Sequence, residues 1–219
     1  MHELDAYRTL YCPAQAEITA KKSRFIASVA PADSEAGALG HVAAVRGQHR
    51  DATHNVYAYR VGLGPEVHRY SDDGEPNGTA GVPVLEVLKK EGLRNVVVVV
   101  TRYFGGTLLG AGGLIRAYGK AAAEGIRAAG VVQMLRHREL SVVLDYPHLG
   151  KVENEIRALG QVVGEIRYGV RVEITVYCRP QAEDELVSRL MDLTGGRLEV
   201  RRYGWEYLAE NNGVCWKPR

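Results

Sequence analysis

Cysteine is scarce in this sequence of 219 residues, and the placement of its three copies excludes the common cysteine-based architectures. Cys12, Cys178 and Cys215 lie far apart and form no CxxC pair. Disulfide frameworks and zinc ribbons require paired or closely spaced cysteines, so we expect neither. We predict no metal site and no cofactor, and we expect a cytoplasmic protein because a reducing compartment suits this cysteine usage.

Long apolar runs are also missing, which argues against a membrane-spanning helix and a membrane partner. The first residues, MHELDAYRTLYC, lack the charged and then apolar pattern of a signal peptide. Hydrophobic residues still make up 46% of the chain, which is enough for one large domain or for two small domains with their own cores.

The net charge is small, +2, and neither demands nor excludes a nucleic acid as partner. Its distribution is uneven, because the segment from Arg102 to Arg138 holds six basic side chains and a single acid, Glu124. Such a local excess suits a phosphate-bearing partner, and it is equally typical of a solvated basic surface.

Hydrophobic patterns predict an α+β protein with domains over residues 1–137 and 138–208 and a loose tail over residues 209–219. In the first domain we expect strand-like segments within residues 16–31, where the basic trio Lys21, Lys22 and Arg24 interrupts them. A helix capped by Asp33 or Ser34 and a strand at HNVYAYRVG follow. Glycine, proline and acids break all periodicity over residues 61–77, which predicts a loop.

Farther along, the sequence predicts a short helix over residues 82–91 and a strand at NVVVVV that is buried on both faces. The helix after the glycine-rich loop has a face of small and apolar residues for close packing on the sheet. Strand, helix, two strands, helix and strand then follow in the second half, which is the βαββαβ order of a ferredoxin-like fold. The small face comprises Leu114, Ala117, Ala121, Gly125 and Ile126.

The turn SDDGEPNGTAG gathers acidic side chains that suggest chemistry. Clustered carboxylates can bind a metal, or one of them can be held protonated as a general acid. Asp-Gly and Asn-Gly steps are also ordinary turn chemistry, and acids are favoured before a helix, which is the better interpretation of the acids alone. The candidate residues are Asp72, Asp73, Glu75 and Thr79.

The loop TRYFGGTLLGAGGL is the stronger candidate for an anion site, with Arg102 and Arg116 placed to clamp a phosphate. Glycines let the backbone approach a ligand closely, and the following helix start offers free N–H groups. The loop matches neither a Walker A sequence nor the dinucleotide fingerprint, and a tight strand-to-helix crossover explains the glycines equally well. The candidate anion- or nucleic-acid-binding residues are Arg102, Tyr103, Gly105, Gly106, Gly110, Gly112, Gly113, Arg116 and Lys120.

The segment HRDATH places His49, Asp51 and His54 at a spacing that fits no standard zinc site. A hydrogen-bonded histidine at the start of a strand is the better interpretation of His54. We keep His54 as a candidate site residue without a metal.

Three blocks of the sequence resemble signature blocks of the IMPACT/YigZ family, and they occur in the family's order: DATHNVYAYR, YSDDGEPNGTAGVPVLEVL and NVVVVVTRYFGGTLLGAGGLIRAYGKAA. The resemblance covers residues 15–130, and the second half is similar to the family's C-terminal domain by pattern more than by letters. It implies a first domain like the second domain of small-subunit ribosomal protein five and domain IV of elongation factor G. It implies a ferredoxin-like second domain, like domain V of that factor.

This pair of domains implies a protein that faces RNA or the ribosome. Eukaryotic members regulate translation initiation by competing for a partner of a stress-response kinase, with an RWD domain for which this sequence has no counterpart. The family supplies no agreed catalytic role. Our leading hypothesis is a non-catalytic, translation-linked module that binds RNA or the ribosome. The alternatives are an enzyme that acts on a phosphorylated or nucleotide substrate, with Mg²⁺ at the acidic turn, and a module that binds a protein partner.

Overall fold

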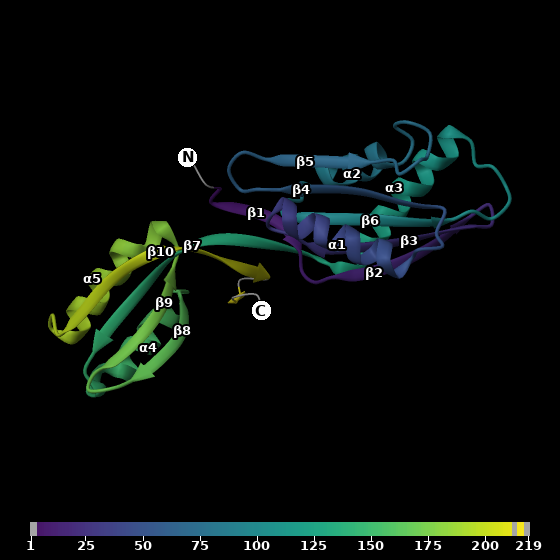
Figure 1. Cartoon of the computed structure of the whole chain (residues 1–219). Coiled ribbons are helices and arrows are strands. Elements are labelled where there is room, and N and C mark those ends of the chain that lie inside the picture. Colours follow the sequence, from purple (N-terminus) through teal and green to yellow (C-terminus); the bar gives the residue numbers. More distant parts are fainter. Residues whose placement is uncertain (1–3, 212–213, 217–219) are drawn as a thin grey trace. The chain divides into compact units, whose positions relative to one another are not determined.

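The computed structural model describes residues 4–211 and 214–216 and divides the chain into two compact units (Figure 1). Unit 1 spans residues 1–133 and unit 2 spans residues 134–219. Both units combine helices with antiparallel sheets, so the chain is an α+β protein. Over the described ranges, no helix has the length and apolar character needed to cross a membrane.

Unit 1 is built on an antiparallel sheet in the order β2-β3-β6-β4-β5. Helices α2 and α3 pack on one face of this sheet and α1 packs on the other. The elements of unit 1 are β1 (Ala6–Leu10), β2 (Ala14–Ala20), β3 (Ser23–Pro31), α1 (Glu35–Gln48), β4 (His54–Val61), β5 (Val67–Ser71), α2 (Gly81–Lys90), β6 (Val96–Tyr103) and α3 (Ala111–Ala129).

The valine run in β6 forms the centre of unit 1, and all five valines are fully buried. Successive side chains of a strand point to opposite faces, so Val96, Val98 and Val100 pack with α2 and α3, whereas Val97 and Val99 pack with α1. The prediction of a strand buried on both faces is confirmed. Burying one such side chain stabilises the fold by about 1.5–3 kcal/mol.

Two further sequence predictions are confirmed in unit 1. Ser34 caps α1, because its hydroxyl accepts a hydrogen bond of 3.2 Å from the N–H of Gly37. The small face of α3 is buried against the sheet, and Gly125 lies directly over Ala27 and Val29 of β3. Small residues at these positions let the helix approach the strand closely.

The interpretation of residues 61–77 as an uninterrupted loop is wrong, because Val67–Ser71 forms β5. This edge strand pairs with β4 through backbone hydrogen bonds, from Tyr57 opposite Ser71 to Val61 opposite Val67. Its side chains are largely exposed, so β5 carries no apolar alternation that a sequence pattern would reveal.

Unit 2 has an antiparallel sheet in the order β11-β10-β7-β9-β8, and its elements follow the expected order βαββαβ. Helices α4 and α5 bury their apolar sides against alternate residues of β7 and β9. The elements are β7 (Val131–Leu144), which begins in unit 1, α4 (Leu149–Ala158), β8 (Val162–Tyr168), β9 (Val172–Cys178), α5 (Glu183–Thr194), β10 (Leu198–Asn211) and β11 (Val214–Trp216), with short 3₁₀ turns at Tyr146–His148 and Pro180–Ala182.

The expected loose tail over residues 209–219 is partly wrong. Strand β10 continues to Asn211 and pairs with β11, with Ala209 opposite Trp216. This pairing gives backbone hydrogen bonds to a segment whose sequence lacks strand periodicity. Residues 212–213 and 217–219 lie outside the described part of the chain.

Replacing Gly125 by alanine is expected to destabilise unit 1 by about 1–3 kcal/mol, the usual cost of overpacking a core. The added methyl would lie 2.8 Å from Cγ1 of Val29 and 3.0 Å from Cβ of Ala27. Gly119 on the same helix is the matched control, since a methyl there would meet only Val87, at 3.9 Å. We expect Gly119→Ala to stabilise the helix by about 0.5–1 kcal/mol. Urea unfolding measures both, and equal effects would contradict the close approach at Gly125.

Candidate nucleic-acid interface

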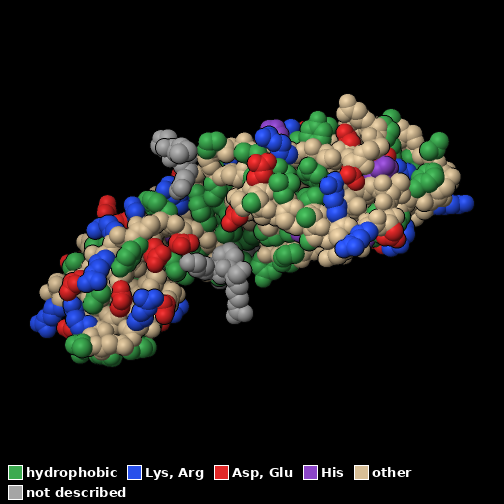
Figure 2. Space-filling model, in the orientation of Figure 1, with side chains coloured by type: hydrophobic (Ala, Val, Ile, Leu, Met, Phe, Trp, Pro, Cys, Tyr) green, Lys and Arg blue, Asp and Glu red, His purple; other side chains and the backbone are tan. Residues whose placement is uncertain are grey.

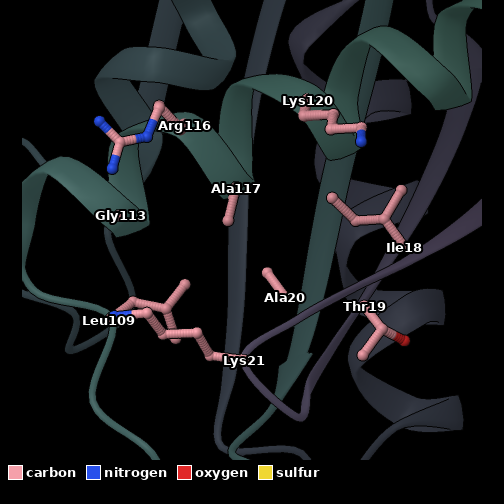
Figure 3. Close-up of a pocket in the computed structure, with 9 residues that line it drawn as sticks. All are labelled: Ile18, Thr19, Ala20, Lys21, Leu109, Gly113, Arg116, Ala117 and Lys120. Carbon is pink, nitrogen blue, oxygen red and sulfur yellow. The ribbon is translucent and has the colours of Figure 1, made fainter.

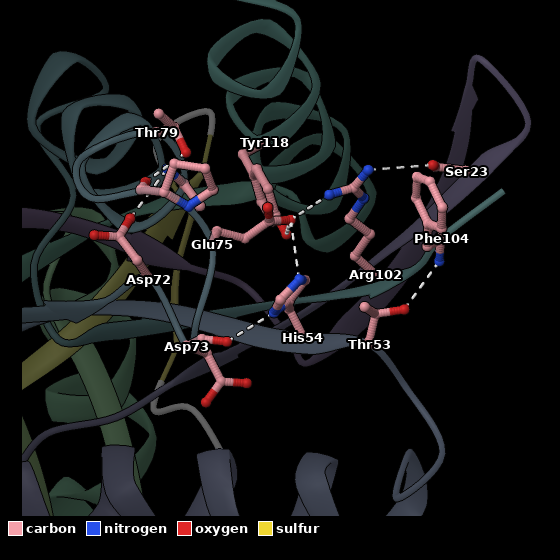
Figure 4. Close-up of polar contacts among 12 residues, drawn as sticks. Ser23, Thr53, His54, Asp72, Asp73, Glu75, Thr79, Arg102, Phe104 and Tyr118 are labelled. Atoms are coloured by element: carbon pink, nitrogen blue, oxygen red, sulfur yellow. Dashed lines mark hydrogen bonds and ion pairs between the residues drawn. The ribbon is translucent and has the colours of Figure 1, made fainter. Parts of the chain in front are cut away.

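The acidic turn between β5 and α2 is held together by its own carboxylates (Figure 4). Asp72 accepts hydrogen bonds from the N–H groups of Gly78, Ala80 and Gly81, at 2.9, 3.1 and 2.8 Å. Gly81 is the first residue of α2, so its N–H has no partner inside the helix, whereas Gly78 and Ala80 precede the helix. Asp72 therefore stabilises the start of α2, as turn chemistry predicts, and Thr79 bonds within the turn to the carbonyl of Pro76 at 2.6 Å.

Asp73 joins the turn to α1 and β4. One carboxylate oxygen accepts a hydrogen bond of 2.5 Å from Arg46, and the other accepts one of 2.6 Å from the N–H of Asn55. The backbone is left-handed at Asp73 (φ +46°) and at Gly74 (φ +88°), which turns the chain sharply before Glu75. Both carboxylate oxygens of Asp73 thus have structural partners.

Glu75 is the centre of a buried polar cluster between the turn, β6 and α3 (Figure 4). Its Oε1 accepts hydrogen bonds from Arg102 Nη1 and from the Tyr118 hydroxyl, both at 2.6 Å. The Glu75 side chain is 3% exposed and that of Arg102 is 6% exposed, so this is a buried ion pair. Burial and the adjacent Glu75 carboxylate raise the pKa of Tyr118 well above its usual range, so the hydroxyl keeps its proton and donates.

His54 completes the cluster. Its Nδ1 lies 2.8 Å from the carbonyl oxygen of Asp73 and therefore carries the proton, because a carbonyl only accepts. Its Nε2 lies 3.8 Å from Oε1 of Glu75. The interpretation of His54 as a hydrogen-bonded histidine agrees with this geometry. In the part of the chain that the structure describes, no three His, Cys, Asp or Glu side chains come together as metal ligands.

Arg102 and Tyr103 do not have the roles that the sequence suggested. Arg102 is buried and bound to Glu75, so it is not available to clamp a phosphate. The Tyr103 hydroxyl lies 2.9 Å from Nδ1 of His49 and donates to Asp51 at 3.2 Å. His49 and Asp51 thus meet at Tyr103, while His54 belongs to the Glu75 cluster.

The glycines between β6 and α3 serve the path of the chain. A Cβ at Gly105 would lie 2.0 Å from the carbonyl carbon of Lys22, so only glycine allows the loop to pack on the β2–β3 turn. Its N–H donates to the hydroxyl of Ser23 at 3.1 Å. Gly106 and Gly110 have φ values of +80° and +72°, whereas a Cβ at Gly113 would collide with Leu109 and one at Gly112 would not. A tight crossover therefore accounts for most of the glycines.

A hollow of about 250 Å³ lies between β2, the β2–β3 turn and the first turns of α3 (Figure 3). Its cations are Lys21, Arg116 and Lys120, and none of them forms an ion pair within the described chain. Arg116 and Lys120 were predicted from the sequence, and Gly113 lies beside them. Lys21 was not among the predicted anion-binding residues. The sequence signal that could have identified it is the basic trio to which it belongs, at positions 21, 22 and 24. The lining residues are Ile18, Thr19, Ala20, Lys21, Leu109, Gly113, Arg116, Ala117 and Lys120.

Comparison with known proteins gives these features a context. Residues 21–126 match the Impact N-terminal domain, and residues 142–197 match a domain of unknown function, DUF1949. The IMPACT family member YvyE of Bacillus subtilis (strain 168) is 42% identical over 94% of this chain and 95% of its own length. The chain belongs to the IMPACT family. The family member YigZ of Escherichia coli (strain K12) is 35% identical over 82% of this chain and 89% of its own length.

A crystal structure described as that of a hypothetical protein is similar to this IMPACT chain. That structure covers 92% of this chain and 98% of its own length, with a TM-score of 0.60 and 30% identity. Among eukaryotic relatives, the Protein IMPACT homolog of Dictyostelium discoideum is 40% identical, and the match spans 42% of this chain and 28% of the relative. The acidic turn, the glycine loop and all three cations of the hollow lie within the matched Impact domain.

Glu75→Ala is expected to lower the free energy of unfolding by about 3–5 kcal/mol, because it leaves the buried cation of Arg102 without its partner. Glu17→Ala is the control: its pair with Arg24 has side chains that are 46% and 53% exposed, and we expect a loss of at most about 1 kcal/mol. Urea unfolding of both variants measures the difference. A loss for Glu75→Ala as small as that for Glu17→Ala would show that the buried pair is not structural.

Proposed function

We propose that this IMPACT family protein is a non-catalytic, translation-linked RNA-binding protein that holds the phosphate backbone in the hollow of unit 1. The observation that carries the proposal is that Lys21, Arg116 and Lys120 line one hollow and have no carboxylate partner in the described chain. Three like charges repel one another, so an anion bound among them would be favoured.

Many other basic side chains of the chain differ from these three, because they form ion pairs with carboxylates. Arg24, Arg46 and Arg102 each pair with a carboxylate in unit 1. In unit 2, Arg167, Arg171 and Arg189 are paired as well, and the face shown in Figure 2 intersperses basic with acidic side chains. A surface of mixed charge gives a polyanion little net attraction. The three cations of the hollow, by contrast, have no carboxylate partner in the described part of the chain and line the same hollow.

The start of α3 adds to the attraction for an anion. Gly110 precedes the helix without a side-chain cap, and Gly113 of the first turn lines the hollow. The first N–H groups of a helix have no partners inside it, and the helix dipole places positive charge there. A phosphate in the hollow would meet this positive end in addition to the three side chains.

The link to translation rests on the fold classes that the family resemblance implies. The βαββαβ order of unit 2 and its antiparallel pairing support a ferredoxin-like domain. A first domain of the ribosomal-protein-five type, followed by such a domain, is the pairing of domains IV and V in elongation factor G. Function depends on sites placed on a fold, and the hollow supplies the chemistry of such a site. We propose a cytoplasmic location and RNA or the ribosome as partner.

The alternative of an enzyme on a phosphorylated substrate has less support. It would use Asp72, Asp73 or Glu75 as base or Mg²⁺ ligand beside the bound phosphate. These carboxylates are engaged by backbone N–H groups and arginines, and none of them lines the hollow. A protein-binding role for the sheet of unit 2 has no specific contact in its favour.

RNA binding by the full chain should weaken steeply with salt if phosphates occupy the hollow. We expect the plot of log association constant against log salt concentration to lose about 0.7 of its slope for each phosphate contact removed, so about 2 in the variant Lys21→Ala/Arg116→Ala/Lys120→Ala. Fluorescence anisotropy with a labelled mixed-sequence RNA hairpin that carries single-stranded tails measures this slope.

The matched control is Lys151→Ala, which removes an exposed cation from α4 of unit 2. It should leave both the affinity and the salt slope near those of the unaltered protein. Salt-insensitive binding, or a triple variant that binds like the unaltered protein, would refute the proposed function.

A further inference from the structure

The two phenylalanines of this chain have opposite environments. Phe25 is fully buried and packs edge-on against Tyr118, with ring centroids 5.2 Å apart. Phe104 opens the glycine loop and is 46% exposed. Tyrosine occurs twelve times in this chain and would carry a hydroxyl at such a position, so an exposed phenylalanine leaves a purely apolar ring in water.

The ring of Phe104 is firmly placed. The buried guanidinium of Arg102 lies over the ring, 5.4 Å from its centroid. The N–H of Phe104 donates to the hydroxyl of Thr53 at 3.0 Å (Figure 4). The next N–H, of Gly105, donates to the hydroxyl of Ser23 at 3.1 Å. A ligand would therefore meet a ring whose backbone is already ordered, which reduces the entropy lost on binding.

A short path of backbone joins this ring to the basic hollow. Gly105, the neighbour of Phe104, packs directly on the backbone of Lys22 and Ser23. Lys21, one residue before that contact, lines the hollow together with Arg116 and Lys120. The contact between the glycine loop and the β2–β3 turn thus connects the apolar ring with the strand end that carries Lys21.

We propose that Phe104 is a stacking platform for an unpaired base of single-stranded RNA whose phosphate lies in the hollow. The inference rests on the proposed function and names its substrate class, single strands in preference to duplexes. Bases stack on exposed aromatic side chains irrespective of sequence, because every base has a π-face. A paired base in a duplex is already stacked on its neighbours and cannot reach the ring.

The experiment compares a labelled single-stranded RNA of about 12 nucleotides with the same sequence in a duplex. This length is within the range of about 4–16 nucleotides that OB-fold domains cover on single strands. A third probe has the same sugar-phosphate backbone with abasic sites throughout. We expect the full chain to bind the single strand more tightly than the duplex or the abasic strand. Phe104→Ala should weaken binding of the single strand by about 5- to 100-fold and leave binding of the abasic strand unchanged.

Three variants separate stacking from apolar contact and from damage to the fold. Phe104→Tyr retains a ring and should bind the single strand like the unaltered protein, while Phe104→Leu fills similar space without a ring and should bind like Phe104→Ala. Leu108→Ala removes an apolar side chain that is 81% exposed in the same loop, and it should have little effect. Equal losses for Phe104→Ala and Leu108→Ala would point to a non-specific apolar surface and overturn the stacking role.

The outcomes distinguish this inference from the proposed function. One outcome would overturn only the stacking platform. In that outcome the triple variant of the hollow abolishes salt-dependent binding, but single strand and duplex bind equally tightly and Phe104→Ala has no effect. Absence of binding to any of the three probes would overturn both.

Discussion

The geometry of unit 1 depends on the buried ion pair between Arg102 and Glu75. One carboxylate oxygen receives the Arg102 guanidinium and the Tyr118 hydroxyl, so β6, α3 and the acidic turn meet at a single atom. Attraction between charges is strong at a site with little water, but so is the cost of removing them from water. Such a pair specifies a unique arrangement more than it adds net stability. Here it fixes where the turn lies and where the glycine loop begins, only a few residues after Arg102.

The structure separates charges that build the fold from charges that remain available. The three acids of the turn are engaged in capping α2, in contacts with α1 and β4, and in the buried cluster. The cations of the hollow have no such partners in the described part of the chain. Of the three blocks that resemble the family's signatures, the second therefore encodes mainly a rigid turn, and the glycine-rich part of the third encodes a tight crossover. The candidate binding chemistry belongs to Arg116 and Lys120, near the end of the third block, and to Lys21, which lies outside the blocks.

Much of the fold could be predicted because its signals are local. The valine run at residues 96–100, the cap at Ser34 and the small face of α3 act through periodicity and neighbouring groups. Strand β5 was missed because an exposed edge strand is held by backbone bonds that leave no apolar pattern. Arg102 was predicted to bind a phosphate because a sequence does not show its contact with Glu75, which lies 27 positions away in the chain. Pairing across the fold is set by tertiary structure and has no signature within either segment.

The same reasoning explains why Lys21 was overlooked while Arg116 and Lys120 were found. The latter two are four positions apart on one helix, so they share a face by helical geometry alone. Lys21 reaches them only because β2 runs along α3 and because Gly105 lets the β2–β3 turn approach the glycine loop. Gly105 was predicted to bind the ligand directly, but its contribution is indirect. It allows the close approach of backbones that places Lys21 beside α3. The glycine loop thus contributes to an anion site through the side chains it brings together more than through its own N–H groups.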